Sequence, residues 1–147
     1  MISRIQYAAF AALLFVATAP GLVQEARAQQ TSDSVSLELN KLEDKEKGCT
    51  ASFVIQNSLP EKFESLRVSM YMFRIDGIID RSWNLELGPL LANKLQIKEF
   101  VMKDTRCDDV GSFLINTINE CRTDAGPVED CLARLKVSSR STVEIRK

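Results

Sequence analysis

This 147-residue chain contains no histidine. The imidazole group is needed for Ser-His-Asp triads and Cys-His pairs, and it is a frequent ligand of metals, so these kinds of site are excluded. There is also no C-x-x-C pair, which argues against a thiol oxidoreductase. The four cysteines are separated by 58, 14 and 10 residues, so they offer no zinc knuckle.

An excess of charge is also missing. Without residues 1–28, which hold Arg4, Arg27 and Glu25, the chain keeps 17 basic residues (19 − 2) and 19 acidic residues (20 − 1). The resulting formal charge of −2 gives no electrostatic reason to expect nucleic acid or an anionic membrane as a partner. No stretch after residue 28 is long and apolar enough to span a bilayer, so we expect no stable membrane insertion of the mature chain.

Residues 1–28 have the layout of a secretory signal peptide. Arg4 precedes an apolar run over 5–23, and the small residues Ala26 and Ala28 stand where a signal peptidase needs them. The run is nearly long enough for the alternative, an uncleaved membrane anchor, but it contains a proline-glycine step that favours cleavage. We expect cleavage after Ala28.

The expected product is a free periplasmic protein with a single domain over 29–147. Arg4 has no arginine neighbour, so a twin-arginine signal is absent, and no cysteine follows the apolar run to accept a lipid. In an oxidising compartment an even set of cysteines is normally paired, so the four cysteines predict a disulfide framework.

Alternation of apolar and polar residues predicts an all-β fold. Strands are expected at 34–40, 49–57, 66–73, 79–87, 95–101, 112–118 and 134–147. Asp76-Gly77 between the third and fourth strands predicts a type I′ hairpin turn. Short strands with turn signals roughly every ten residues are typical of a two-sheet sandwich of the immunoglobulin or fibronectin kind. Met70, Met72 and Trp83 are expected in its core.

Helical signals are few and lie in the last third of the chain. Residues 127–135 predict a short helix, because Pro127 suits a first turn and the apolar residues share one face. Asp108 is a candidate cap for a helical turn after Cys107.

Strand order gives a preferred cysteine pairing. In such a sandwich the second and fifth strands are antiparallel neighbours, which makes Cys49 and Cys107 natural partners. Cys121 and Cys131 would then close the segment between the sixth and seventh strands. A rival pairing of Cys107 with Cys121 stays open, because sequence alone does not fix connectivity.

The third strand carries large apolar residues on both faces. Tyr71, Phe73 and Ile75 lie opposite the methionine stripe, and a sandwich strand should turn one face to water. Either the short helix or the N-terminal segment covers them, or they form a docking patch for a protein partner, flanked by Arg67 and Arg74.

The remaining candidates for chemistry are carboxylates. Asp104, Asp108 and Asp109 would make a weak calcium site if their loop curled around a cation. A solvated acidic turn is the alternative interpretation. We expect no cofactor and no catalytic residue.

Parts of the chain resemble known families. The stretches "LNKLEDKEKGCTASFVIQN", "CDDVGSFLIN" and "LKVSSRSTVEI" resemble small exported alphaproteobacterial proteins labelled Tat pathway signal sequence domain proteins, a label that implies export and no particular activity. More loosely, residues 52–81 are similar to FxLYD-type sandwich modules, with Phe73 and Arg74 at the positions of the tyrosine and aspartate.

These observations predict an exported, non-catalytic binding or adaptor protein of the cell envelope, with another envelope protein as partner. The alternative is a carboxylate-based, metal-dependent periplasmic factor or enzyme. A third possibility is a structural protein whose terminal strand extends another protein's sheet.

Overall fold

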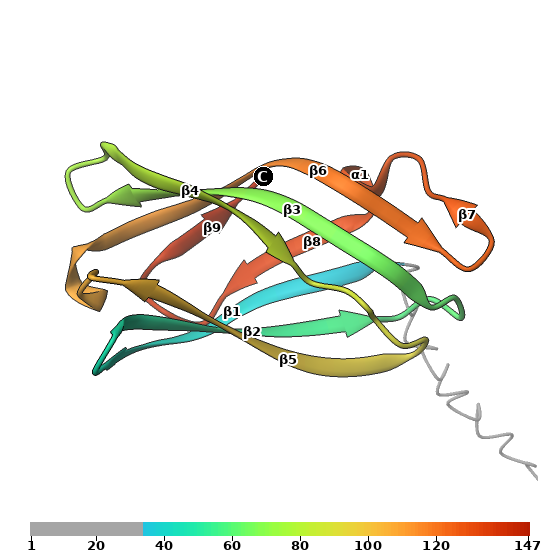
Figure 1. Ribbon diagram of the computed structural model, residues 1–147, viewed down its shortest axis with the longest axis horizontal. Coiled ribbons are helices and arrows are strands. Elements are labelled where there is room, and N and C mark those ends of the chain that lie inside the picture. Colours follow the sequence, from blue (N-terminus) through green and yellow to red (C-terminus); the bar gives the residue numbers. More distant parts are fainter. Residues whose placement is uncertain (1–33) are drawn as a thin grey trace, which may run out of the picture. The chain divides into compact units, whose positions relative to one another are not determined.

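The computed structural model describes residues 34–147, so the expected signal peptide and its cleavage site lie outside the described residues. The described chain contains nine strands, a 3-10 turn and a short helix (Figure 1). In chain order they are β1 (Val35–Lys45), β2 (Gly48–Asn57), β3 (Phe63–Arg74), β4 (Ile79–Glu86), β5 (Lys94–Lys103), η1 (Cys107–Asp109), β6 (Val110–Thr123), β7 (Gly126–Pro127), α1 (Cys131–Arg134), β8 (Leu135–Ser139) and β9 (Glu144–Arg146).

The strands form the predicted two-sheet sandwich. One sheet has the order β5-β2-β1-β8, and the other has the order β4-β3-β6-β7, with β9 also paired to β6. The pairings of β2 with β5 and of β3 with β6 are antiparallel, as in an immunoglobulin-like sandwich. Within residues 34–147, no helix has the length and hydrophobicity to cross a membrane.

The C-terminal region corrects the expected count of seven strands. The stretch expected as one strand over 134–147 is divided into β8, which is parallel to β1, and β9, which is parallel to β6 in the other sheet. Between them the Ser139 hydroxyl donates to the Val143 carbonyl at 2.6 Å and accepts from the Ser141 N–H at 3.1 Å. These bonds turn the chain from one sheet to the other. The extra two-residue strand β7 completes the nine.

The helix is shorter than predicted. It covers Cys131–Arg134 instead of 127–135, because Pro127 is part of β7 and the Val128 N–H is bonded to the Cys121 carbonyl at 3.0 Å. Asp130 before the helix has a left-handed backbone with φ 55°. Residues 127–130 therefore form the end of a strand and a turn, and the helix begins only after them.

The predicted cap of the 3-10 turn is also wrong. Asp108 lies inside η1, the residue at the cap position is Arg106, and no side chain caps the turn. The Asp108 carboxylate instead pairs with the Arg106 guanidinium at 3.3 Å.

The core lies between the sheets. Met70 and Met72 on β3 are fully buried, as predicted, and the Phe53 ring of β2 meets the Phe113 ring of β6 edge to face at 6.4 Å. Trp83 packs against this core, as predicted, but is only partly buried because β4 is the outermost strand of its sheet. Burial of this apolar surface is the main stabilising contribution to the fold.

Candidate functional site

The outer face of β3 carries half-buried aromatic residues. Tyr71 lies opposite Leu114 of β6, and Phe73 lies opposite Ile79 of β4. Directly opposed residues of antiparallel strands point to the same face, so these side chains form one apolar strip on the outside of the sandwich. Tyr71, Phe73 and Leu114 are half-buried.

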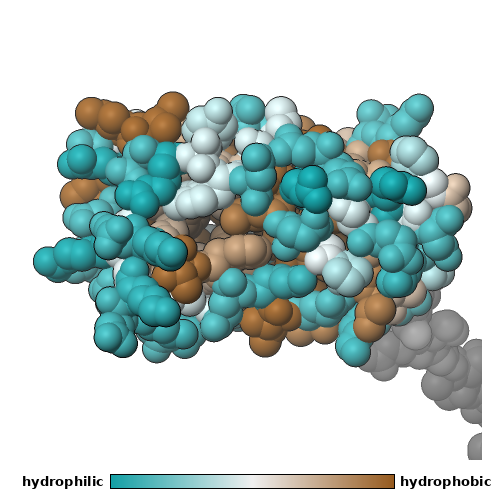
Figure 2. Space-filling view, in the orientation of Figure 1, coloured by the Kyte–Doolittle hydropathy of each residue, from teal (hydrophilic) through white to brown (hydrophobic). Residues whose placement is uncertain are grey.

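The strip continues into the turn between β3 and β4. The exposed fractions of Ile75, Ile78 and Ile79 are 73%, 64% and 53%. We call Tyr71, Phe73 and these isoleucines the hairpin patch. Figure 2 shows hydrophobic residues gathered at the upper left of the molecule, where Figure 1 places this turn.

The turn sits where it was predicted but has another geometry. The Arg74 N–H donates to the Ile78 carbonyl at 2.8 Å, so the loop has three residues. Among its residues only Gly77 has a positive φ, of 81°, whereas a type I′ turn needs two such residues. The Asp76 carboxylate accepts the Ile78 N–H at 3.0 Å. This bond helps to fix the backbone that presents the exposed isoleucines.

The short helix does not cover the hairpin patch. Cys131 of α1 is bonded to Cys121, which lies seven residues further along β6 than Leu114. At roughly 3.4 Å per residue, this separation is on the order of 24 Å. The expectation that the helix shields the aromatic residues is therefore wrong, since the disulfide holds α1 near the other end of β6. The other expected cover, the N-terminal segment, lies outside the described residues.

The two arginines expected beside the patch have different surroundings. Arg74 pairs with Asp76 at 3.5 Å, next to the exposed isoleucines. Arg67 lies further along β3 and pairs with Glu86 of β4 at 3.2 Å and with Glu120 of β6 at 3.3 Å. Arg67 therefore connects three strands, and only Arg74 borders the turn.

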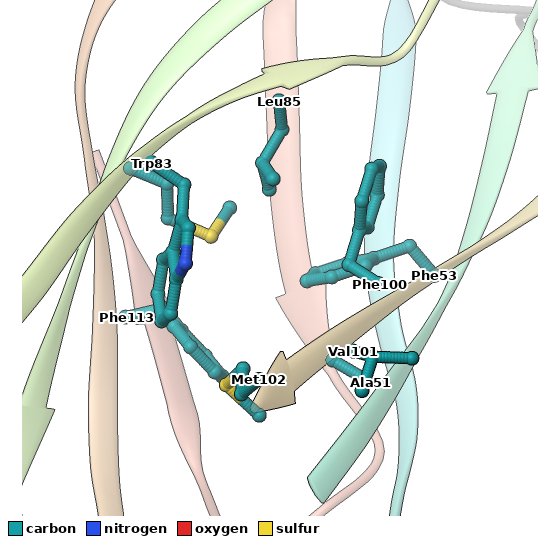
Figure 3. A pocket seen from close by; sticks show the side chains of 9 residues that line it. Ala51, Phe53, Trp83, Leu85, Phe100, Val101, Met102 and Phe113 are labelled. Atoms are coloured by element: carbon teal, nitrogen blue, oxygen red, sulfur yellow. The ribbon is translucent and has the colours of Figure 1, made fainter. Parts of the chain in front are cut away.

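A cavity opens between the edge strands of the two sheets (Figure 3). It has a volume of about 180 Å³ and is lined only by apolar residues from five strands. This cavity could not be predicted from the sequence, because its walls come from distant parts of the chain. These lining residues are Ala51, Phe53, Met70, Trp83, Leu85, Phe100, Val101, Met102 and Phe113.

Both disulfides follow the pairing that strand order favours. Cys49 is bonded to Cys107 with a Cα–Cα distance of 4.9 Å, and Cys121 to Cys131 with a distance of 6.5 Å. The first bond joins the start of β2 to the 3-10 turn that follows β5. None of the described cysteines is free, so the described chain offers no thiol for chemistry.

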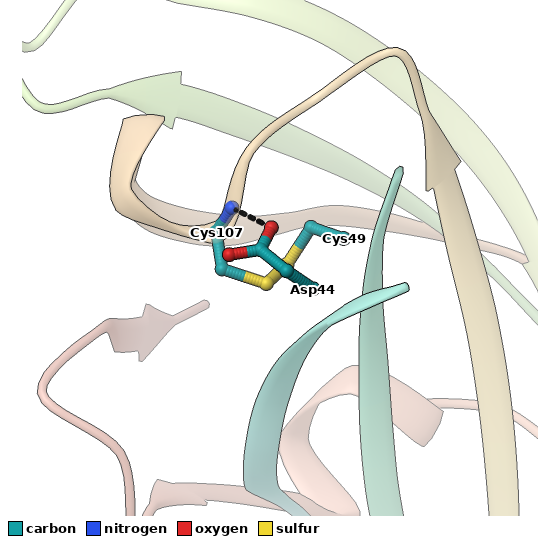
Figure 4. Close-up of side chains that lie close together, drawn as sticks. All are labelled: Asp44, Cys49 and Cys107. Carbon is teal, nitrogen blue, oxygen red and sulfur yellow. Dashed lines mark hydrogen bonds between the residues drawn. A yellow bond between two sulfur atoms is a disulfide. The ribbon is translucent and has the colours of Figure 1, made fainter. Parts of the chain in front are cut away.

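Asp44 lies beside the first disulfide (Figure 4). Its carboxylate and the sulfurs of Cys49 and Cys107 lie within 4.8 Å of one another, which is close enough for a metal cluster. The sulfurs are bonded to each other, however, and the Asp44 carboxylate accepts the Cys107 N–H at 2.8 Å. This arrangement is structural, and a hydrogen bond across 63 residues leaves no local signal in the sequence.

The three candidate metal ligands are not brought together. Among the described residues, the only cluster of three possible metal ligands is the one that Asp44 forms with the two cysteines of the first disulfide. It includes none of Asp104, Asp108 and Asp109. Asp104 and Asp109 border a shallow depression that two arginine side chains also line. The Asp108 side chain is 82% exposed and paired with Arg106.

The fold and these sites define a disulfide-bonded, immunoglobulin-like β-sandwich with apolar surfaces at a hairpin and between two edge strands. Comparison of the chain with protein-family models, with curated proteins and with solved structures finds no match.

Proposed function

We propose that this chain is an exported, non-catalytic binding protein of the cell envelope, and that the hairpin patch docks onto another envelope protein. The observation that carries the proposal is the exposure of Ile75, Ile78 and Ile79, at 73%, 64% and 53%, around one short turn. Single exposed apolar residues are common on soluble proteins, whereas a group of them indicates an interaction site.

The turn is well suited to binding because its backbone is already ordered. The Arg74–Ile78 backbone bond and the contact from Asp76 to the Ile78 N–H hold it without a partner. A surface that is ordered before binding loses less conformational entropy on association, so more of the burial energy contributes to affinity. Arg74 and Asp76 add a polar border beside the apolar centre, which is the usual arrangement of an interface.

Two disulfides support the proposed export to the periplasm, because such bonds form and persist in oxidising compartments. The resemblance to small exported proteins points the same way. The arrangement of Asp104, Asp108 and Asp109 does not favour the metal-dependent alternative, because these residues share no cluster within the described chain.

The test is capture of envelope proteins by the purified mature chain, with the Ile75→Ser/Ile78→Ser double variant beside wild type. Tyr71 and Phe73 are less suitable sites, because they are half-buried and their loss would also affect folding. Ile97→Ser is a matched control, since Ile97 is 65% exposed but lies on β5 in the other sheet. Substitutions at such surface sites change stability by about 0.5 kcal/mol or less.

We expect the double variant to bind the captured partner at least about tenfold more weakly, since each isoleucine removed from water contributes roughly 1.5–3 kcal/mol. The Ile97→Ser control should bind like wild type. Equal binding by the double variant, or equal loss with the control, would refute the patch as the docking surface.

A further inference from the structure

The cavity between the sheets lies at an opening in the sandwich. β4 is the outer strand of one sheet and β5 is the outer strand of the other, and the two are not paired with each other. Side chains bridge this gap at two places: Arg81 donates to the Lys103 carbonyl at 3.0 Å, and Lys98 donates to the Gly88 carbonyl at 3.1 Å. These two hydrogen bonds hold β4 and β5 near each other, and the gap between the strands remains open between the two bonds.

The cavity is reachable from solvent. Val101 at its rim is 47% exposed, and Trp83 and Phe100 are half-buried. Figure 2 shows a hollow bordered by hydrophobic residues near the middle of the face on which β4 and β5 lie. Deeper in the cavity, Ala51 and Met70 are 2% and 1% exposed, so the site has a solvent-accessible mouth and a buried, apolar interior.

One lining side chain carries a strong hydrogen-bond donor. The indole N–H of Trp83 has no acceptor within the described chain. In Figure 3 the indole nitrogen lies on the edge of the ring that is turned towards the labelled residues of the opposite wall. An indole N–H donates only, and this one is not among the buried polar atoms that lack a partner, so water can reach it in the free protein and a ligand acceptor can replace that water. The cavity therefore combines apolar walls with a single unused donor.

The volume sets the size of the ligand. A cavity of about 180 Å³ is slightly larger than an engineered apolar cavity of roughly 150 Å³ that takes up benzene. One ring with a small substituent therefore fits. Larger molecules would have to leave most of their surface in water.

We propose that this cavity is a binding site for a small apolar molecule with one aromatic ring and a single hydrogen-bond acceptor. The ring lies among Phe53, Phe113 and the two methionines, and the acceptor meets the Trp83 N–H. The site is separate from the hairpin patch, since none of its lining residues belongs to that patch. The two proposals can therefore fail independently.

The first experiment titrates the full mature protein with anisole and with ethylbenzene, which have nearly the same shape but differ in an ether oxygen. Trp83 is the only tryptophan in the chain, so its emission reports on the cavity. The methyl NMR signals of Met70 and Met102 report on the walls, whereas Met72 is buried but does not line the cavity and is an internal control.

We expect saturable changes in the Trp83 emission and in the Met70 and Met102 signals, with a much smaller change at Met72. If no signal saturates up to the solubility limit of either probe, the proposal is wrong. A change at Met72 as large as those at Met70 and Met102 would also refute it, because it would indicate general loosening of the core.

Three variants test the geometry. Ala51→Leu fills the interior, and Val101→Phe narrows the mouth at an exposed position where folding is not at risk. Each should weaken binding of both probes by about tenfold, the effect of losing roughly one well-packed side-chain contact. Unchanged affinity in both variants would place the probes elsewhere and refute the site.

Trp83→Phe keeps an aromatic ring but removes the donor, and binding to it is followed by the methyl signals. Anisole should lose roughly two- to tenfold in affinity relative to ethylbenzene, as expected for one hydrogen bond. An equal effect on both probes would refute the role given to the indole N–H.

Discussion

The Asp44 carboxylate accepts a hydrogen bond of 2.8 Å from the backbone N–H of Cys107. The end of β1 therefore helps to position Cys107, which forms a disulfide with Cys49. Asp44→Ala should destabilise the fold by about 1–2 kcal/mol, the value of a hydrogen bond to a charged group at a partly solvated site. Urea unfolding measures the change. Asp44→Asn keeps an acceptor oxygen and should lose less; equal losses would show that the contact to Cys107 is unimportant.

The two disulfides should differ in their contribution to stability. Chain-entropy arithmetic gives roughly 4 kcal/mol for the bond across 58 residues and roughly 3 kcal/mol for the bond across 10 residues. We expect Cys49→Ala/Cys107→Ala to be the more damaging pair of substitutions and Cys121→Ala/Cys131→Ala the milder one, measured by urea unfolding. The reverse order would mean that native contacts of α1 outweigh the restriction of the unfolded chain.

Asn57 is predicted to be a critical buried polar residue. It is fully buried, and its amide donates to the carbonyls of Glu61 at 2.8 Å and Leu91 at 3.1 Å and accepts the Leu59 N–H at 3.0 Å. Asn57→Ala should cost about 2–4 kcal/mol, because it leaves the buried Leu59 N–H without a partner and removes two partly buried hydrogen bonds as well.

Asn57→Asp tests the contribution of the amide NH2 group as a donor, because it leaves the size of the side chain unchanged. It keeps the shape and the acceptor oxygen but replaces the donor with an oxygen that faces two carbonyls. We expect thermal unfolding at neutral pH to show a loss at least as large as that of the alanine variant. A near-native melting temperature for the aspartate variant would contradict this account.

Glu38 gives a prediction about pH. Its pKa lies below the ordinary value, first because Asn40 donates to the carboxylate. Desolvation is the next cause and raises the pKa, and the Arg140 guanidinium at 2.8 Å lowers it further. A lowered folded-state pKa adds stability above the unfolded pKa, and this stability is lost as the pH falls through the folded value.

The comparison with Glu38→Gln isolates this contribution from the other carboxylates. Wild type should be the more stable protein at neutral pH, and its advantage should fade at acid pH, below the ordinary pKa of glutamate. Urea unfolding at a series of pH values measures both. A difference that does not depend on pH would show that the interaction is not electrostatic.

The first six strands could be predicted because each has a local signal. The apolar period of two in β3 and the Asp76-Gly77 turn need no knowledge of the rest of the chain. The division of residues 134–147 could not be predicted, since it depends on hydrogen bonds of Ser139 and on parallel pairing with β1 and β6. Alternation placed Trp83 correctly on the inner face of its strand, where it packs against the core, but it could not show that the strand lies at an edge and leaves this side chain partly exposed.

The candidate sites divide in the same way. The hairpin patch was foreseen in part, as Tyr71, Phe73 and Ile75, because apolar residues on both faces of one strand are visible in the sequence. Ile78, Asp44 and the cavity were not foreseen. Their importance comes from a turn geometry and from contacts between distant segments, for which a single sequence gives no signal.

The parallel pairing of β1 with β8 has a consequence for biogenesis. β1 lies between β2 and β8, so the strand nearest the start of the described chain gains its second neighbour only when nearly all the residues have been delivered. Pairing over such a separation makes folding slow. For a protein exported as we propose, this topology would delay completion of the β5-β2-β1-β8 sheet until the chain has crossed the membrane.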